Sequence, residues 1–461
     1  MLTSEQRVMG SYKDPSGYVF QKDGQLYRRI NESYLDTYNL VRDSGLFQEL
    51  MKERLLIEHE EISVEDGDDP HAIIRPRMVR FITYPYEWCF SQLKDAALAT
   101  LAIQRIAISK GFTLKDAHGF NIQFDRGLPI LIDTISFDRW DHAPWVAYRQ
   151  FCESFLIPLA LMGYRSQHLN TLLTRFLNGI PLEIGSGLLP LRTRFSLPLL
   201  MHVHLHARKA IEDSKLNNTS PAFNSSRSFS EHSMLGLCMS LEKAIRSIKP
   251  PEAESVWDTY YQKSCIYSQE AFNYERQFIA SIAQEQRPSV VWDLGCNTGE
   301  FSVLAAKHSD LVVAIDNDAA CIEQLYQYCK KEQIVNILPL QMDLVNPSAA
   351  LGWELQERLS LFERGGCDLA LALALIHHLC ISANIPIEYM ARFLGRVSKR
   401  LIIEFIPKED PQVNALLSSR KDIFANYNHE TFESEFKQYF RIIRKDHLVD
   451  SHRTLYYMER Y

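Results

Sequence analysis

Residues 289–299, SVVWDLGCNTG, decide the fold of the C-terminal half of the chain. The stretch begins with a short apolar run that is typical of a buried parallel strand, and it ends in a turn that contains Gly295 and Gly299. The run EFSVLAAKHS follows this turn with a helical pattern. A strand, a glycine-containing turn and a helix in this order are typical of the first unit of a doubly wound α/β sheet.

The chain downstream of this unit repeats the strand pattern. Four further apolar runs predict buried strands: LVVAID at 311–316, ILPLQMD at 337–343, DLALALAL at 368–375 and LIIEFI at 401–406. A helix is expected at 319–331, and strands that alternate with helices predict a parallel sheet. Two late runs, at 441–448 and 454–460, flank a short turn and predict a closing antiparallel hairpin.

Polar residues gather where these strands end, which is where ligands bind in open α/β sheets. The first turn lacks the middle glycine of the dinucleotide pattern G-x-G-x-x-G, and this favours a ligand without phosphates. Asp316 lies 21 residues after Gly295, where a carboxylate can accept hydrogen bonds from both ribose hydroxyls. Asp343, at the end of the third strand, can accept one from an adenine amino group. A nucleoside held in this way fits S-adenosylmethionine.

The motifs DLGCNTG, AIDND, QMDL and LALALIHHL, in this order and spacing, resemble those of class I methyltransferases over about residues 251–461. The resemblance implies S-adenosylmethionine as cofactor. It implies contacts to the amino acid part of the cofactor from Asp293, Gly295, Cys296, Asn297 and Gly299, to the ribose from Asp316 and Asn317, and around the adenine from Asp343 and Leu344. The open alternative is a Rossmann-like domain that binds another nucleotide or has lost its ligand.

Methyl transfer requires a nucleophile placed in line with the electrophilic sulfonium, and in some cases a base. His377 and His378 follow the fourth strand and face that position, and we expect at most one to reach the substrate because adjacent residues point in different directions. Glu404, within the fifth strand, is the other candidate. The alternatives are that the histidines pack or bind backbone, and that Glu404 holds a structural partner such as an arginine.

Other candidate substrate or cofactor contacts rest on position alone. Lys408 and Arg420 lie in the polar segment after the fifth strand, which is expected to form part of a substrate lid. Lys263 or Tyr267, upstream of the first strand, is a candidate for the methionine carboxylate.

The N-terminal half carries a second informative pattern. The run GYVFQKDGQLYRRI at 17–30 predicts a hairpin around a D-G turn, and helices are expected at 46–59 and 89–110. In the segment 111–137, the residues Asp116, His118 and Asn121 form D-x-H-x-x-N, and Asp133 follows a short hairpin. A loop aspartate with an asparagine and a second aspartate suits phosphoryl transfer with ATP and Mg²⁺.

This pattern resembles aminoglycoside-phosphotransferase-like and related atypical kinases, which implies a kinase-like α+β domain. The chain departs from such kinases, since Leu114 stands where they have His and neither G-x-G-x-x-G nor V-A-I-K is present. Arg28 or Arg29 would have to replace the usual lysine, with Glu53 or Glu60 as its partner from the helix. We therefore expect a kinase-like domain that has lost phosphotransfer activity. The alternatives are active phosphotransfer and a local β-turn-β unit without the kinase fold.

The two halves meet in a Ser- and Asn-rich stretch, LNNTSPAFNSSRSFSEHS at 216–233, followed by a short apolar helix and Pro250-Pro251. The expected organisation is a kinase-like domain at 1–213, a linker with a short helix at 214–250 and a methyltransferase domain at 251–461. The whole chain, including PWVAYRQFCESFLIPLALM at 144–162, resembles a nodulation-protein-related bacterial family of large methyltransferases. This implies a fused N-terminal domain for substrate recognition and, by association, a sugar or glycolipid acceptor.

The composition excludes several classes of protein. A net charge of −7 argues against a protein that coats nucleic acid. The first thirty residues lack an apolar core, and the best candidate for a membrane span, 369–387, contains both histidines and Pro386, so we expect no signal and no span. Nine scattered cysteines without C-x-x-C predict free thiols in the cytoplasm. The segment HVHLHAR at 202–208 is predicted to be helical, and histidines spaced two residues apart on a helix point in different directions. No metal site is therefore expected there.

Overall fold

The computed structural model describes residues 7–62, 72–215, 229–250, 268–418 and 421–461. The chain forms two compact units, the first made of residues 1–252 and 350–358 and the second of residues 253–349 and 359–461. Most of the Ser- and Asn-rich stretch, as well as Lys263, Tyr267 and Arg420, lies outside the described residues.

This division differs from the expected organisation in two places. Helix α9 (Glu231–Ser247) packs against α3 (Phe90–Ser109) in the first unit, because it buries an apolar face that includes Met234 and Leu241 there. Arg105 on α3 also donates to Glu242 on α9 at 3.0 Å. The segment 350–358, between two strands of the second unit, belongs to the first.

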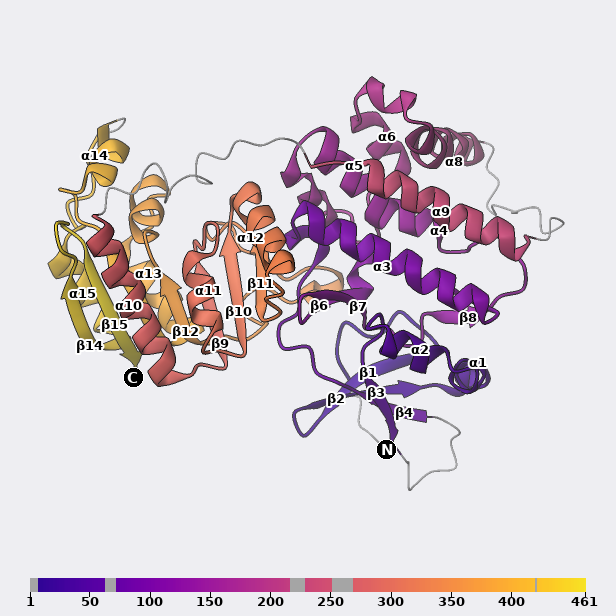
Figure 1. Cartoon of the computed structure of the whole chain (residues 1–461), viewed down its shortest axis with the longest axis horizontal. Helices are drawn as coiled ribbons and strands as arrows, with labels where there is room; N and C mark the ends of the chain where they lie inside the picture. Colours follow the sequence, from indigo (N-terminus) through magenta and orange to yellow (C-terminus); the bar gives the residue numbers. More distant parts are fainter. Residues whose placement is uncertain (1–6, 63–71, 216–228, 251–267, 419–420) are drawn as a thin grey trace. The chain divides into compact units, whose positions relative to one another are not determined.

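The second unit is built on a seven-stranded sheet in the order β11-β10-β9-β12-β13-β15-β14 (Figure 1). The first five of these strands are parallel, and β15 pairs antiparallel with both β13 and β14. The expected α/β sheet with a closing antiparallel hairpin is therefore confirmed. The strands are β9 (Val290–Leu294), β10 (Leu311–Asp316), β11 (Ile337–Gln341), β12 (Cys367–Ala372), β13 (Ser398–Phe405), β14 (Phe440–His447) and β15 (Thr454–Arg460).

The central position of β9 follows from its sequence. Val291, Trp292, Asp293 and Leu294 are all buried, as expected for a strand with neighbours on both sides and helices above and below. The sheet runs outward from β9 through β10 on one side and through β12 on the other. This reversal of strand order leaves a crevice at the carboxyl ends of the strands, where ligands of such sheets bind.

Helices of the second unit connect these strands. They are α10 (Gln269–Gln286), α11 (Glu300–Ala306), α12 (Ala319–Lys331), the π-helical segment η10 (His378–Ser382), α13 (Ile387–Val397), α14 (Pro411–Ser418) and α15 (His429–Phe436). Helix α12 has the bounds that the sequence predicts, and its N-terminus is capped by Asp318, whose carboxylate accepts from the backbone of Ala320 and Cys321.

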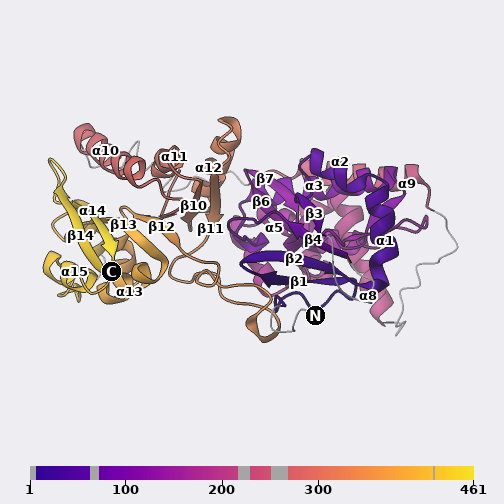
Figure 2. The same ribbon diagram turned by 90° about the horizontal axis from the view of Figure 1, so that it is seen from below.

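The first unit holds a four-stranded sheet in the order β1-β2-β4-β3 and two short two-stranded pairs (Figure 2). The strands are β1 (Gly17–Lys22), β2 (Gln25–Ile30), β3 (His59–Ile62), β4 (Ala72–Pro76), β5 (Phe112–Leu114) with β8 (Phe137–Arg139), and β6 (Ile122–Asp125) with β7 (Leu128–Leu131). The predicted hairpin at 17–30 is confirmed, with Asp23 and Gly24 at its turn and both at positive φ.

Helices make up the rest of the first unit. They are α1 (Glu32–Asp43), α2 (Leu46–Lys52), α3, α4 (Tyr148–Phe151), α5 (Ile157–Tyr164), α6 (Leu182–Leu188), α7 (Leu197–Leu199), α8 (His206–Lys215) and α9, with short 3-10 or π segments that include η6 (Leu191–Phe195) and η7 (Leu200–Leu205). The helix predicted at 46–59 is too long. It ends at Lys52 because the following residues pair with β7, where Ile57 donates to the carbonyl of Leu131 at 2.8 Å.

No helix in the described part of the chain is long and apolar enough to cross a membrane.

Gly299 offers a test of the turn after β9. Its φ is +85°, and a Cβ there would lie 2.3 Å from Cδ1 of the buried Leu325, whereas Gly365, at φ +103°, has no atom within 4 Å of such a Cβ. Both Gly299→Ala and Gly365→Ala force alanine into a left-handed backbone conformation, which costs about 1–2 kcal/mol of stability. Only Gly299→Ala also overpacks the core. We expect Gly299→Ala to lower the free energy of unfolding in urea by about 1–3 kcal/mol more than Gly365→Ala does. Equal losses would contradict the packing role of Gly299.

Candidate functional site

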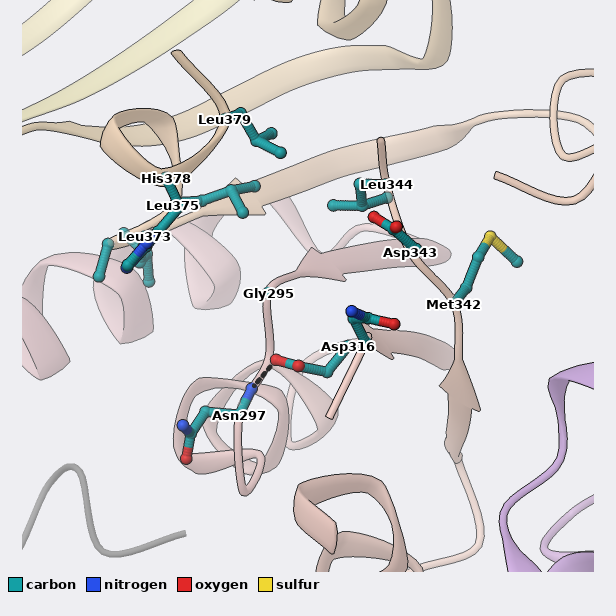
Figure 3. Close-up of a pocket in the computed structure, with 12 residues that line it drawn as sticks. Gly295, Asn297, Asp316, Met342, Asp343, Leu344, Leu373, Leu375, His378 and Leu379 are labelled. Atoms are coloured by element: carbon teal, nitrogen blue, oxygen red, sulfur yellow. Dashed lines mark hydrogen bonds between the residues drawn. The ribbon is translucent and has the colours of Figure 1, made fainter. Parts of the chain in front are cut away.

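A pocket of about 250 Å³ lies at the carboxyl ends of the central strands of the second unit (Figure 3). Residues that follow β9, β10, β11 and β12 contribute to its wall, as expected for the point where the strand order reverses. Its lining residues are Gly295, Asn297, Asp316, Asn317, Met342, Asp343, Leu344, Leu373, Ala374, Leu375, His378 and Leu379.

The turn after β9 forms one side of this pocket. Its conformation needs a left-handed backbone at Gly295, Asn297 and Gly299, with φ of +77°, +50° and +85°. The backbone N–H groups of Gly295 and Cys296 both donate to the carbonyl of Ile315, at 2.9 and 3.0 Å. The turn is thus fixed against the end of the neighbouring strand β10.

Asp316, the last residue of β10, is tied to the same turn. One carboxylate oxygen accepts from the backbone N–H of Asn297 at 2.8 Å, drawn as a dashed line in Figure 3, and the other from the N–H of Asp318 at 2.9 Å. Burial raises the pKa of Asp316, and these hydrogen bonds oppose that rise. Because each carboxylate oxygen has a second lone pair, the side chain can still accept two hydrogen bonds from a ligand.

Six of the nine predicted cofactor residues line the pocket: Gly295, Asn297, Asp316, Asn317, Asp343 and Leu344. The other three do not. The carboxylate of Asp293 is buried and accepts a 2.5 Å hydrogen bond from Ser302, Cys296 is buried in the turn, and Gly299 packs against Leu325. Their place in the structure is to support the turn.

The pocket also has apolar lining residues that were not predicted from the sequence. Met342 lies beside Asp343. On the opposite side of the pocket lie Leu373, Leu375 and Leu379 (Figure 3). Their positions at or just after strand ends are the signal that could have identified them. In sequence, however, such residues look the same as core residues of the strands.

The two candidate histidines have different environments. His378 lines the pocket, whereas His377 is fully buried and does not, although the ring centroids lie 4.1 Å apart. Burial lowers the pKa of both side chains, and the charge of Arg453 lowers that of His378 further. His378 is therefore a neutral imidazole at the pocket wall near pH 7, which is the form that accepts a proton.

Glu404 does not line the pocket and lies in a buried network beneath it. Its carboxylate accepts from the backbone N–H of Ala374 at 2.9 Å and from Arg453 at 3.4 Å. Arg453 also donates to Asp410 at 2.6 Å. Glu404 thus has the structural arginine partner that the sequence left open as the alternative to substrate binding. Lys408, the predicted substrate contact, pairs with Asp422 at 2.8 Å.

Glu275 on α10 is a further member of this network that the sequence did not reveal. It is 2% exposed, and its pKa is raised well above the usual range by burial and by the charge of Glu404. Glu275 is one of three glutamates in this amphipathic helix, and nothing in the sequence indicates that it is the one that points into the core.

The predicted phosphoryl-transfer residues lie together in the first unit. Asp116 accepts from the backbone N–H of His118 at 3.0 Å, and its pKa is raised by burial and by the charge of Asp133. Burial lowers the pKa of His118 to about 4, and Arg358 in the segment 350–358 contributes.

For two of the four candidate residues of the expected ion pair, Arg28 and Glu60, the structure shows other partners, and the alternative pair of Arg29 and Glu53 stays a prediction. Arg28 pairs with Asp133 instead of a helix glutamate, and Glu60 pairs with Arg75. Arg28 comes from β2 and faces the loop after β7, and this places it opposite the carboxylate that was expected to hold a metal ion.

The described residues contain no group of three or more His, Cys, Asp and Glu side chains placed to hold a metal ion. His202 and His204 lie on the helical segment η7, where each bonds to hydroxyl groups: His202 to Tyr148 and Ser240, and His204 to Ser186 and Thr193.

Comparisons with known proteins give one extended match. No protein-family model matches the sequence. The nodulation protein NoeA of Rhizobium meliloti (strain 1021) is 32% identical over 464 residues, with 98% of this chain and 96% of that protein covered.

Solved structures give weaker similarities. The N-methyltransferase NodS from Bradyrhizobium japonicum WM9, in complex with S-adenosyl-L-homocysteine, is 13% identical, with 42% of this chain and 89% of NodS covered at a TM-score of 0.32. The bifunctional kinase-methyltransferase WbdD is 20% identical, with 45% of this chain and 44% of WbdD covered at a TM-score of 0.31.

Asp293 provides a pH-dependent test of the buried support beneath the turn. Burial raises its pKa from 3.8 to about 7, so its contribution to stability is complete below pH 4 and is lost as the pH rises through 7. Asp293→Asn does not titrate. The free energy of unfolding of Asp293→Asn relative to the wild type should therefore shift in favour of the variant, by up to about 4 kcal/mol, between pH 4 and pH 8. Urea unfolding followed by tryptophan fluorescence measures it, and a difference independent of pH would show that Asp293 is ionised throughout.

Proposed function

The chain belongs to the family of the nodulation protein NoeA, and we propose that it is a methyltransferase that uses S-adenosylmethionine. The observation that carries this proposal is the pocket between the turn after β9 and two carboxylates, Asp316 and Asp343, at the ends of adjacent strands. These hydrogen-bond acceptors suit a nucleoside with ribose hydroxyls and an amino group, and the described wall has no lysine or arginine for a phosphate.

The pocket residues fit the cofactor part by part. Asp316 accepts from the ribose hydroxyls, with Asn317 beside it, because its carboxylate is fixed by the backbone of Asn297 and keeps free lone pairs. Asp343 accepts from the adenine amino group, and Leu344 packs against the ring. Gly295 and Asn297 lie where the amino acid part binds, while Asp293, Cys296 and Gly299 maintain the turn from below.

The bound cofactor supplies an electrophilic methyl group, and the protein must orient the acceptor and handle its proton. His378 is the residue placed for the proton, since it lies on the pocket wall and burial keeps its imidazole neutral. His377 and Glu404 are positioning residues in this proposal, because both are buried, and Glu404 holds the backbone of Ala374 at the pocket. The acceptor is an oxygen or nitrogen of a small molecule, for which a sugar is the first candidate.

Calorimetry with S-adenosylhomocysteine tests the cofactor site. Asp316→Asn keeps the shape of the side chain and removes its charge, so we expect binding to weaken by about tenfold or more, and Asp316→Ala to weaken it further. Asp310→Asn, at the amino end of the same strand, is the matched control and should bind as the wild type does. Absence of binding by the intact wild-type chain would rule out the proposed cofactor.

We propose that the first unit recognises the substrate and does not catalyse phosphotransfer. Asp133 is paired with Arg28 and also accepts from the hydroxyl of Ser136, so its carboxylate is already neutralised where a kinase needs it for metal binding. Phosphotransfer with ATP and Mg²⁺ is the second candidate, and the clustering of Asp116, Asn121 and Asp133 favours it.

A thermal-shift measurement with ATP and Mg²⁺ separates these two roles. A recognition unit with its Arg28–Asp133 pair intact should show no increase in melting temperature at millimolar ATP. An increase that Asp133→Ala abolishes and Asp138→Ala, in the nearby strand β8, leaves in place would establish nucleotide binding instead.

A further inference from the structure

The first unit exposes an unusual number of large apolar side chains in one short stretch. Among the described residues, 26 large hydrophobic side chains are exposed, and seven of them fall within residues 184–205. The most exposed are Phe195 at 91%, Leu191 at 71%, Leu197 at 66% and Met201 at 54%. Scattered exposed apolar residues are ordinary, but such a concentration marks an interaction surface.

The pattern along the helical run 197–209 shows that this exposure is built in. Leu199 and Val203 are buried against the unit, while Leu197, Met201 and Leu205 are exposed at a spacing of four residues. The run is therefore apolar on the outward side as well as on the inward side. A surface helix of a globular unit normally places polar residues on its outer side.

The stretch is held firmly in place, so the exposure does not come from a loose segment. His204 of η7 bonds to Ser186 of α6 at 2.8 Å and to Thr193 of η6 at 2.9 Å. The packing of α6 against α8 and η7 completes this arrangement (Figure 1). We define the 184–209 surface as the exposed side chains of residues 184–209 on these elements.

The charge of this surface is opposite to that of the chain. Residues 184–209 contain four arginine and lysine residues, all exposed, and no aspartate or glutamate, and the exposed Glu183 directly precedes them, whereas the whole chain has a net charge of −7. Arg192 and Arg194 alternate with the exposed apolar residues of η6, and Arg208 and Lys209 continue the exposed stripe of the helical run. Apolar side chains with interleaved guanidinium groups match an interface of acyl chains and anionic headgroups.

We propose that the 184–209 surface binds peripherally to membranes that contain anionic lipids. Leu191, Phe195, Leu197 and Met201 enter the headgroup–acyl boundary, while the arginines contact phosphates. This contact requires no membrane-spanning helix. It places the first unit at a lipid surface, independently of methyl transfer in the second unit.

Co-sedimentation of the full chain with vesicles tests the proposal. We expect binding to vesicles of equal parts phosphatidylcholine and phosphatidylglycerol, weaker binding to phosphatidylcholine alone, and release by high salt. Leu191→Glu/Phe195→Glu should weaken binding by about tenfold or more, and Arg192→Gln/Arg194→Gln should remove the preference for phosphatidylglycerol. Leu40→Glu, which alters a side chain 51% exposed on α1, is the matched control and should bind normally.

Two results would overturn the proposal. One is the absence of wild-type binding to both kinds of vesicle, or binding that Leu191→Glu/Phe195→Glu leaves unchanged. The other is a dimer in light scattering that the same double variant dissociates while vesicles bind neither protein, which would assign the surface to a second copy of the chain. Since both substituted residues are exposed, unchanged thermal unfolding is expected and checks that the variant is folded.

Discussion

The hydrogen bond from the backbone of Asn297 to the carboxylate of Asp316 is the interaction on which the candidate site depends. It joins the turn after β9 to the end of β10, and it is possible only because Asn297 adopts a left-handed conformation between two glycines that do the same. The two backbone bonds from Gly295 and Cys296 to Ile315 hold the turn from the other side. One wall of the pocket and the orientation of its central carboxylate are thereby set together.

A second constraint acts from beneath the pocket. Arg453, in the turn of the closing hairpin directly before β15, is buried between Glu404 of β13 and Asp410, and Glu404 in turn holds the backbone of Ala374 at the pocket wall. Loss of one partner from such a network leaves a buried charge without compensation, which costs about 3–5 kcal/mol. The antiparallel hairpin is therefore connected to the pocket through charged groups, and this explains why a glutamate occupies the apolar strand β13.

The sequence was sufficient for the sheet and for most of the pocket, because both follow from strong local patterns. Apolar runs predicted the five parallel strands of the second unit, two late runs around a turn predicted its hairpin, and the spacing of Gly295, Asp316 and Asp343 placed these residues at neighbouring strand ends. The partner of Glu404 could not be predicted, because Arg453 lies 49 residues away and only the folded sheet brings the two together. The pairing of Arg28 with Asp133 and the burial of Glu275 are long-range in the same sense.

Incubation of the protein with methyl-labelled S-adenosylmethionine and fractionated cell extract tests the central claim most directly. We predict that the wild type transfers label to a small-molecule fraction and that Asp316→Asn transfers far less, because the pocket carboxylate binds the cofactor. Equal labelling by both proteins in every fraction, or none above background with the wild type, would contradict the assignment of this pocket to methyl transfer.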